Sequence, residues 1–488
     1  MTDSGAGDSV AVAPGEGLPE GWGRATIREL CAAVAKVQPD ELDRATFQYV
    51  DIGSIASDEF VVSAAKEITV RAAPSRARQL IQAGDTVFST VRPYLKKIAW
   101  IPESLDGEIA STGFCVLRPG AALDSRFLFH LVTSDDFVVR ITEKQRGVSY
   151  PAVREVDILE EEIWVPPLPE QRRIAAKLDE QLAHIEAGEA AARTALASSE
   201  ILRDRITGEG ACGGLDGAEL FPAELEKADA DDGVLPNLPL GWRWARLGEI
   251  AAVAGGVTKD SKKQSDPDYV EVPYLRVANV QRGRLVLDRI EKIRVPAVKA
   301  DALRLVKGDV LLNEGGDRDK LGRGWIWEEQ IEDCIHQNHV FRARVVNDII
   351  DPLLLAWHAN SFGKSWCDRN GKQTVNLASI SLRKIKLLPV PVPPREVQAE
   401  LVKVIQSHVA EAAAAHQLAQ GALAQASELR GALLHAAFTG ALVPQDPSDE
   451  PAAVLLDRIR AQRLPAVRPV RKRVPRKTTP PGQEELPQ

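Results

Sequence analysis

The sequence predicts an α+β protein in which two similar mixed α/β domains are joined by two long helices that form an antiparallel coiled coil. Two long segments contain no proline beyond their first turn, and both repeat small or apolar residues at steps of three and four. That spacing is typical of a helix that buries one seam against another helix. A stretch of short strand-like and helix-like runs precedes each segment, and the two stretches resemble each other.

The two helices are expected at residues 166–208 and 393–440. Both follow a Pro-Pro pair, which suits only the first turn of a helix. Both end at a Thr-Gly, where glycine can adopt the left-handed cap conformation. Glu170 and Glu396 lie near the starts, where a negative charge suits the helix dipole. Each helix would be roughly 65 Å long at 1.5 Å per residue, so each needs an equally long partner.

The three-four spacing also predicts which residues form the seam of each helix. In the first helix they are Ile174, Leu178, Gln181, Ile185, Gly188, Ala192, Ala195, Ser199, Leu202 and Ile206. In the second helix they are Leu401, Val404, His408, Ala415, Leu418, Ala422, Leu429, Ala432 and Ala436. The second seam is rich in alanine, so the partner backbone can approach closely while each contact buries little area.

The domain that precedes each helix is predicted to be a duplicate of the other. The segment LPEGWGRATIRELCAAVAK, from residue 18, matches LPLGWRWARLGEIAAVAGG, from residue 238. The distance between the copies is too long for a solenoid repeat and suits a duplicated domain. Both copies continue with a Gly-Asp turn between short apolar strands, a helix (residues 127–139 and 353–366) and a polar loop that contains glycine.

The remaining segments are expected to connect these parts or to be disordered. A last segment with clustered Arg468, Arg471, Lys472, Arg473, Arg476 and Lys477 favours a solvated tail, with auxiliary phosphate binding as the alternative. The expected boundaries are a disordered N-terminus at 1–17, a first domain at 18–165, the first helix at 166–208, a Gly- and acid-rich linker with one short helix at 209–236, a second domain at 237–392, the second helix at 393–440, an extension at 441–464 with a short helix capped by Ser448 or Asp449, and a disordered basic tail at 465–488.

Composition narrows the class of protein. The formal net charge of −8 argues against strong attraction of the whole chain to a polyanion, but it allows a local basic face. The five cysteines are scattered and form no CxxC pair, which indicates buried thiols in a reducing cytosol rather than disulfides or a zinc site. No apolar run is long enough to span a bilayer and no signal-peptide pattern is present, so a cytoplasmic protein without a membrane partner is expected.

Enzyme motifs are absent from the sequence. A DNA methyltransferase needs an Asn/Asp-Pro-Pro-aromatic motif to hold a flipped base, and a motor needs GxxxxGK[ST]; neither occurs. The glycines at 315–316 and 322–324 do not make GxGxxG and are interpreted as turns. The HQNH run at 336–339 lacks a carboxylate or cysteine at matching spacing, so a polar strand edge or a DNA-facing segment is favoured over a metal site.

The order of the parts resembles the specificity subunit of type I restriction–modification systems. The resemblance covers nearly everything between residues 18 and 463. Two departures are noted: Val397 stands where the first helix has Gln171, and the first helix ends in Ile206 where the second has Phe438. The segments that carry the resemblance are PPLPEQRRIAAKLDEQ at 166–181, PPREVQAELV at 393–402, LLHAAFTGALV at 433–443, EPAAVLLDRIRAQR at 450–463, and the two Gly-Trp domain starts.

The resemblance implies a DNA-recognition subunit without catalytic activity. Each domain would read one half of an asymmetric, interrupted site on double-stranded DNA. The coiled coil would set the gap and dock two methyltransferase subunits, which two motor-nuclease subunits join where a nuclease is present. No cofactor is expected in this chain, because S-adenosylmethionine, and ATP with Mg in the presence of a nuclease, would belong to the partners. Helices over ~50 Å long can hold two domains more than one DNA turn, about 34–36 Å, apart.

Two other interpretations remain open. One is a specificity subunit of a modification-only methyltransferase complex. The other is a coiled-coil scaffold with no role on DNA, which would leave the two diverged domains unexplained.

Candidate DNA contacts are polar and basic residues on loops at corresponding places in the two copies. Base edges and phosphates are both contacted by such side chains. In the first domain they are Arg92, Tyr94, Lys96 and Lys97 in one loop, and Lys144, Gln145, Arg146, Ser149 and Tyr150 in another. In the second domain they are Arg318, Lys320 and Arg323, then Asn338 and His339, then Arg369, Asn370, Lys372, Gln373 and Asn376, with the loop at 369–376 expected to enter a groove.

Overall fold

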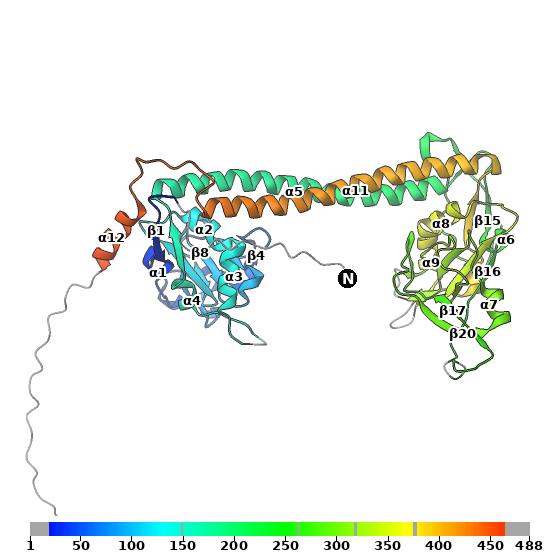
Figure 1. Ribbon diagram of the computed structural model, residues 1–488, viewed down its shortest axis with the longest axis horizontal. Helices are drawn as coiled ribbons and strands as arrows, with labels where there is room; N and C mark the ends of the chain where they lie inside the picture. The colour runs from blue at the N-terminus through cyan, green and yellow to red at the C-terminus, as the bar shows by residue number, and fades with distance from the viewer. Residues whose placement is uncertain are drawn as a thin grey trace, which may run out of the picture. The chain divides into compact units, whose positions relative to one another are not determined.

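The computed structural model describes residues 19–463, except 148–149, 261, 263, 317–319 and 374–377. The chain divides into two compact units, one made of Met1–Gly188 with Gln425–Gln488 and the other of Glu189–Ala424. Each unit contains one mixed α/β domain and the adjoining portions of two long helices (Figure 1). The expected disordered ends, 1–17 and 465–488, lie outside the described residues.

The long helices α5 (Leu168–Ala211) and α11 (Arg395–Phe438) each contain 44 residues. They run side by side and in opposite directions within each unit (Figure 1). In the second unit Ser199 Oγ lies 3.0 Å from His416 Nδ1, and a Cβ added to Gly210 would lie 2.7 Å from Ile405 Cγ1. The predicted antiparallel coiled coil is therefore present.

The predicted seam is correct for much of α5 and wrong by one residue in α11. Ile174, Leu178, Ala192, Ser199 and Ile206 are buried, whereas the predicted seam residues Gly188, Ala195 and Leu202 are exposed. In α11, Leu418 and Leu429 keep 76% and 59% of their surface. The buried side chains Val402, Ile405, Ala419 and Ala437 each follow a predicted seam residue by one position, and the buried Ala412 lies between two predicted seam residues. Alanine occurs on several faces of this helix, so the sequence does not clearly distinguish the buried face from the exposed faces.

The end of α11 is as predicted, but α5 continues past its Thr-Gly. Gly440 takes a positive φ of +80°, and Ala441 N donates to Ala436 O at 2.8 Å. In α5 the same arrangement occurs at Gly213, with φ +74°, where Gly214 N donates to Glu209 O at 2.8 Å. Gly208 thus lies inside the helix, where a glycine costs about 1 kcal/mol without breaking it. The counterpart of Phe438 is accordingly Ala211 and not Ile206.

The first domain contains two four-stranded sheets, with orders β6-β3-β10-β7 and β2-β11-β8-β9, and a β1-β12 pair that leads into α5. The helix predicted at 127–139 is two helices, because Ser134 breaks the chain direction and caps the second. The elements are β1 (Gly23–Thr26), α1 (Ile27–Leu30), β2 (Cys31–Ala32), β3 (Thr46–Val50), β4 (Ile55–Ala56), β5 (Val61–Val62), β6 (Lys66–Thr69), β7 (Ala77–Leu80), β8 (Thr86–Ser89), β9 (Ile98–Trp100), β10 (Ile109–Ser111), β11 (Phe114–Pro119), α2 (Ser125–Thr133), α3 (Asp135–Glu143), α4 (Glu155–Leu159) and β12 (Glu162–Val165).

The second domain repeats this plan, with sheets β20-β17-β24 and β16-β25-β21-β23 and a β15-β28 pair that leads into α11. The helix predicted at 353–366 is again two helices, which meet at Ser361. The elements are β14 (Leu238–Pro239), β15 (Arg243–Arg246), α6 (Leu247–Ile250), β16 (Ala251–Ala254), β17 (Tyr269–Leu275), β18 (Val280–Gln281), β19 (Arg284–Leu285), β20 (Glu291–Pro296), α7 (Ala297–Leu303), β21 (Val310–Asn313), β22 (Gly315–Gly316), β23 (Gly324–Ile326), β24 (Ile335–His336), β25 (Val340–Val345), α8 (Pro352–Asn360), α9 (Phe362–Asn370), β26 (Lys372–Gln373), β27 (Ala378–Ser379), α10 (Leu382–Ile385) and β28 (Pro389–Val392).

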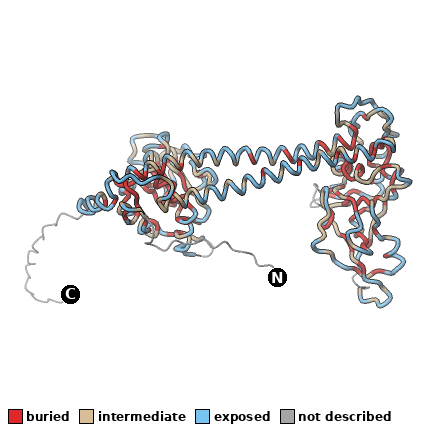
Figure 2. The backbone as a smooth tube through the Cα atoms, turned by 45° about the horizontal axis from the view of Figure 1, so that its top comes forward, coloured by how far each residue is buried: buried red, intermediate tan, exposed pale blue. Residues whose placement is uncertain are grey.

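Both domains keep their cores on the inner faces of these sheets and helices, while the long helices bury one side only (Figure 2). The five cysteines are free and buried, as predicted. Burial raises the pKa of the Cys212, Cys334 and Cys367 thiols to about 12, so these sulfurs stay protonated near neutral pH.

A buried glutamine fastens each long helix to its domain. Gln171 Oε1 accepts from Asp124 N at 2.8 Å, and its Nε2 donates to Ala122 O and Pro166 O at 3.0 and 2.9 Å. In the second domain Gln398 Oε1 accepts from Asp351 N at 2.7 Å, and its Nε2 donates to Ile349 O and Pro393 O at 2.9 and 3.0 Å. The residue equivalent to Gln171 is therefore Gln398, and the departure assigned to Val397 was an error of one position.

Replacing Gln398 with alanine should lower the free energy of unfolding of the second unit by about 3 kcal/mol. The change leaves one backbone N–H and two carbonyls without their partner in a buried place, and each such loss costs roughly 1–3 kcal/mol before water enters. Urea denaturation followed by tryptophan fluorescence measures the effect. Gln406→Ala, at an exposed position of the same helix, is the control and should stay within about 0.5 kcal/mol of the parent.

The segments between and after the domains are folded onto them. In the expected linker, a 3-10 turn at Leu215–Gly217 is followed by β13 (Leu220–Phe221), which pairs with β14. In the C-terminal extension, α12 (Ala452–Arg463) buries Ala452 and Leu456 against the first domain. The predicted cap, Ser448 or Asp449, was wrong, because the helix begins only at Ala452. Ser448 Oγ donates to Asp446 Oδ1 at 2.7 Å, and Asp449 forms an ion pair with Arg173 at 2.7 Å.

Candidate nucleic-acid interface

In the first domain, a short ladder of main-chain hydrogen bonds brings the two predicted contact loops together. Ala152 forms antiparallel bridges with both Val91 and Arg146. Arg92 N donates to Pro151 O at 2.8 Å, and Arg146 N donates to Ala152 O at 2.8 Å. Main-chain hydrogen bonds to residues 151 and 152 thus hold the loop that begins at Arg92 next to the loop that contains Arg146.

The second domain contains the same ladder in a more regular form. Strand β27 lies between β22 and β26, with Ser379 opposite both Gly315 and Lys372. Ile380 N donates to Glu314 O at 2.8 Å, as Val153 N donates to Thr90 O at 2.8 Å in the first domain. The predicted loops therefore lie at equivalent places in the two copies and are paired in the same way.

A third predicted segment adjoins the ladder in the second domain. Glu314 N donates to His339 O at 2.9 Å, and His339 Nδ1 lies 2.7 Å from Glu314 Oε2. Asn338 is half-buried, and its Nδ2 lies 3.4 Å from His339 Nε2. The corresponding bond in the first domain joins Thr90 N to Gly113 O at 2.9 Å. Asn338 and His339 are thus next to the ladder.

Aromatic and basic side chains dominate the exposed part of the first ladder. The Arg92 guanidinium stacks over the Tyr150 ring at 5.8 Å, and Tyr150 keeps 77% of its surface. Tyr94 keeps 46%. Arg92 and Lys96 both take a φ of +48°, which is uncommon for residues with a side chain and is often found at functional sites. Arginine over an aromatic ring is suited to stacking on bases or contacting phosphate.

Several basic side chains that are predicted to contact DNA from the first domain form hydrogen bonds or ion pairs within the protein. Lys97 Nζ donates to Ile55 O at 2.6 Å, and Lys96 Nζ lies 2.5 Å from Asp135 Oδ1. Lys144 pairs with Glu161, and Arg146 lies 3.6 Å from Asp157. Hydrogen bonds from Arg154, with Arg146 nearby, hold the pKa of Asp157 well below its usual range. Lys97 and Lys144 therefore have positioning contacts in addition to any role on DNA.

In the second domain Lys372 and Gln373 are exposed on strand β26. Lys320 and Arg323 are half-buried beside β22 and β23. Three predicted residues, Ser149, Arg318 and Asn376, lie outside the described residues. His339 and Arg369, also predicted in this domain, are exposed as well.

Arg369 and Asn370, at the end of α9, contact the chain segment that precedes the domain. Arg369 donates to Asp232 O at 3.1 Å, and Asn370 exchanges two hydrogen bonds with the main chain of Asp231. Sequence interpretation treated Asp231 and Asp232 as linker and missed this contact. The only available signal was the run of acidic residues there, which could equally have been solvated.

The HQNH run does not form a metal site in the part of the chain that the structure describes. His336 is buried, and its Nδ1 donates to Val340 O at 2.6 Å. Burial lowers the pKa of His336 to about 4, so its ring is neutral near pH 7. Across the described residues, no group of three or more His, Cys, Asp or Glu side chains is placed to hold a metal ion. Within the same residues, no helix is both long and apolar enough to cross a bilayer.

Comparison with known proteins identifies relatives of the whole arrangement. The model of the type I restriction modification DNA specificity domain matches residues 19–192 and again 239–420. The specificity subunits of the type I restriction enzymes EcoDI and EcoKI of Escherichia coli are 24% and 23% identical to the chain over 70% and 74% of its length, and the matches cover 77% of each relative.

Two solved structures share the fold over most of the chain. One is a chain of a type I R-M system, with 30% identity and a TM-score of 0.69, covering 87% of this chain and 99% of that one. The other is the HsdS subunit from Thermoanaerobacter tengcongensis, with 29% identity and a TM-score of 0.57, covering 87% and 98%. Each of the two matches to the family model covers one of the duplicated domains and the first part of the long helix that follows it. The chain therefore belongs to the family of type I restriction modification DNA specificity domains and carries two copies of that domain.

Proposed function

We propose that this chain is the DNA sequence-specificity subunit of a type I restriction–modification complex. The observation that carries the proposal is the repeated ladder, which places a pair of polar loops at the same position of each recognition domain. Each loop pair would contact one half of a bipartite site on double-stranded DNA. Side chains on loops held by a rigid sheet are a common means of reading base edges and phosphates.

The two halves of the target should differ. The first ladder presents Arg92, Tyr94 and Tyr150, whereas the second presents Lys372 and Gln373 beside a Gly-Gly strand. Different side chains form different hydrogen-bond patterns with base edges. An asymmetric target, interrupted by a gap that the paired helices set, follows from the proposal.

The proposed partners supply the chemistry. Two methyltransferase subunits would dock on the coiled coil and bring S-adenosylmethionine, and two motor-nuclease subunits that use ATP and Mg would join where a nuclease is present. The chain itself would be non-catalytic and would act in the cytoplasm. Its formal net charge of −8 implies that partner subunits provide much of the contact to phosphate. A modification-only complex would use the same chain in the same way.

Replacing Lys372 and Gln373 together with alanine should weaken binding of the co-purified complex to its target by about tenfold or more. Each lost base or phosphate contact costs on the order of 1–3 kcal/mol. A gel-shift titration at fixed salt measures the change, with Lys299→Ala on the exposed face of α7 as a control that should bind like the parent. Unchanged binding by the double variant would contradict the assignment of β26 to the interface.

A further inference from the structure

Residues 223–235, here called the acidic segment, are packed against the second domain although they precede it in sequence. Ala223, Leu225 and Leu235 contact a small core formed by Cys212, Leu238 and Trp244. Ala230 packs against the main core of the domain. These apolar contacts give the segment a fixed path along the domain surface.

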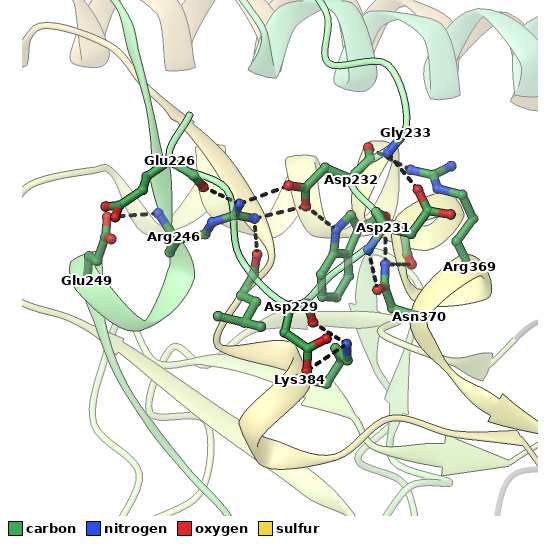
Figure 3. A network of polar contacts seen from close by, with 12 residues as sticks. Glu226, Asp229, Asp231, Asp232, Gly233, Arg246, Glu249, Arg369, Asn370 and Lys384 are labelled. Carbon is green, nitrogen blue, oxygen red and sulfur yellow. Dashed lines mark hydrogen bonds and ion pairs between the residues drawn. The ribbon is translucent and has the colours of Figure 1, made fainter. Parts of the chain in front are cut away.

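An ion pair between the buried Arg246 and the half-buried Asp232 anchors the acidic segment to strand β15. The Arg246 guanidinium donates to Asp232 Oδ1 and Oδ2 at 2.9 and 2.8 Å, and also to Glu226 O at 2.6 Å (Figure 3). Trp366 Nε1 donates to Asp232 Oδ1 at 2.9 Å. Burial raises the pKa of Asp232, but the hydrogen bonds from Arg246 and Trp366 outweigh that effect and keep the pKa below its usual value. Arg246 and Trp366 are themselves buried, so this carboxylate satisfies polar groups that water does not reach.

The same segment fixes the last turn of α9. Trp366, Arg369 and Asn370 lie three and four positions apart, so they share one face of that helix. All three contact the acidic segment: Trp366 through the Asp232 carboxylate, Arg369 through Asp232 O, and Asn370 through the main chain of Asp231 (Figure 3). Gly233 has a φ of +64°, and a Cβ there would lie 2.9 Å from an Arg369 guanidinium nitrogen, so the segment and the helix are in close contact.

The fixed turn leads directly into the strand that carries the candidate DNA contacts. Only Gly371 separates Asn370 from Lys372. Gly371 N donates to Cys367 O at 2.7 Å, and a Cβ on Gly371 would lie 2.8 Å from Leu321 Cδ1. The connection is therefore short and closely packed, and a shift of the end of α9 would move Lys372 and Gln373.

The first domain fixes its equivalent turn with a residue of its own. Glu161, which immediately precedes β12, is largely buried and pairs with Arg140 Nε at 2.9 Å and with Lys144, at the end of α3. The equivalent turn is thus held by Glu161 in the first domain and by the acidic segment in the second.

From these contacts we infer that the acidic segment is a functional part of the second recognition domain, and that Asp232 is a positioning residue that holds strand β26 in place to read its half-site. The inference rests on the proposed function and adds a specificity determinant outside the predicted boundary at residue 237. Asp232 itself does not contact DNA in this mechanism. Its carboxylate acts through Arg246 and Trp366 on the end of α9.

The experiment measures sequence discrimination at each half-site separately. Complexes of methyltransferase subunits with the parent chain, Asp232→Ala, Asp232→Asn or Glu161→Gln act on two DNA libraries, each with one half of the parent's target randomised. Sequencing of the methylated products gives the ratio of cognate to mismatched sites for each half. Asp232→Ala should lower this ratio about tenfold at one half and leave the other within about twofold, whereas Glu161→Gln should affect the opposite half.

The outcomes separate the inference from the function on which it rests. If the parent complex selects no bipartite sequence, the proposed function fails. If the parent selects one but Asp232→Ala and Asp232→Asn change neither half, or reduce both halves equally, the positioning role is overturned. If the alanine variant does not fold, Asp232→Asn, which keeps the size of the side chain, is used alone. A loss of discrimination at one half only supports the positioning role, and no loss or an equal loss at both halves overturns it.

Discussion

Replacing Asp85 with alanine should lower the free energy of unfolding of the first domain by about 3–5 kcal/mol, the usual cost of removing one partner of a buried ion pair. Asp85 is 1% exposed and sits at the Gly-Asp turn that the sequence predicts in both copies. It accepts from Arg118 Nε at 2.9 Å, Arg118 Nη2 at 2.7 Å and Gln82 N at 2.8 Å. Alanine would leave the arginine, whose side chain is 16% exposed, without its countercharge.

Thermal and urea unfolding of the parent and variant chains test this expectation. The double variant Asp85→Ala Arg118→Met should recover part of the loss, because it removes both charges. Asp58→Ala, at an exposed position, should change stability by about 0.5 kcal/mol or less. The second domain repeats the pair, with Arg344 Nε and Nη2 at 2.7 and 2.8 Å from the Asp309 carboxylate. A small effect at Asp85 would therefore contradict a large contribution of either pair to stability.

Inserting seven residues into each long helix should change the gap of the DNA target and leave both half-sites as they are. Suitable points are after Gly188 in α5 and after Ala424 in α11, where the chain passes from one unit to the other. Seven residues preserve the three-four seam and add about 10 Å of helix. That length corresponds to about three base pairs at roughly 3.4 Å each.

Sequencing of DNA modified by the complex would measure the new gap. The native target should be methylated at least about a hundredfold less, and a target with the same halves and a longer gap should replace it. Insertion into α5 alone, which puts the two seams out of register, should abolish methylation of both targets. A change of base preference in either half would contradict the role of the helices as a spacer.

Much of the fold could be predicted because its signals are local. The Pro-Pro starts of the long helices, the Gly-Asp turns and the duplicated Gly-Trp segments are short patterns with a direct structural cause. The seam of α11 was misplaced by one residue because alanine occupies several of its faces. The end of α5 depends on Gly213, whose Cβ would lie 2.4 Å from Pro239 Cγ, and this contact is remote from the helix in sequence.

The candidate interface was predictable in position but not in detail. The loops around Arg92 and Arg146 were identified from their charge and their equivalent places in the two copies. Their pairing through Ala152, and the contact of Lys144 with Glu161, depend on residues that only the folded chain brings close. The part played by Asp232 was missed for the same reason, since its partners Arg246 and Trp366 are distant in sequence.

The packed acidic segment bears on how new specificities arise by gene recombination. A crossover that imports a different second domain takes both residues at positions 232 and 246 from the same parent only if it falls upstream of the codon for Asp232. The codons for α5 offer such a place, because its exposed face tolerates sequence change and its seam follows a simple repeat. A junction at the Leu-Pro-x-Gly-Trp motif, although obvious in an alignment, would separate Asp232 from the arginine and tryptophan that it serves.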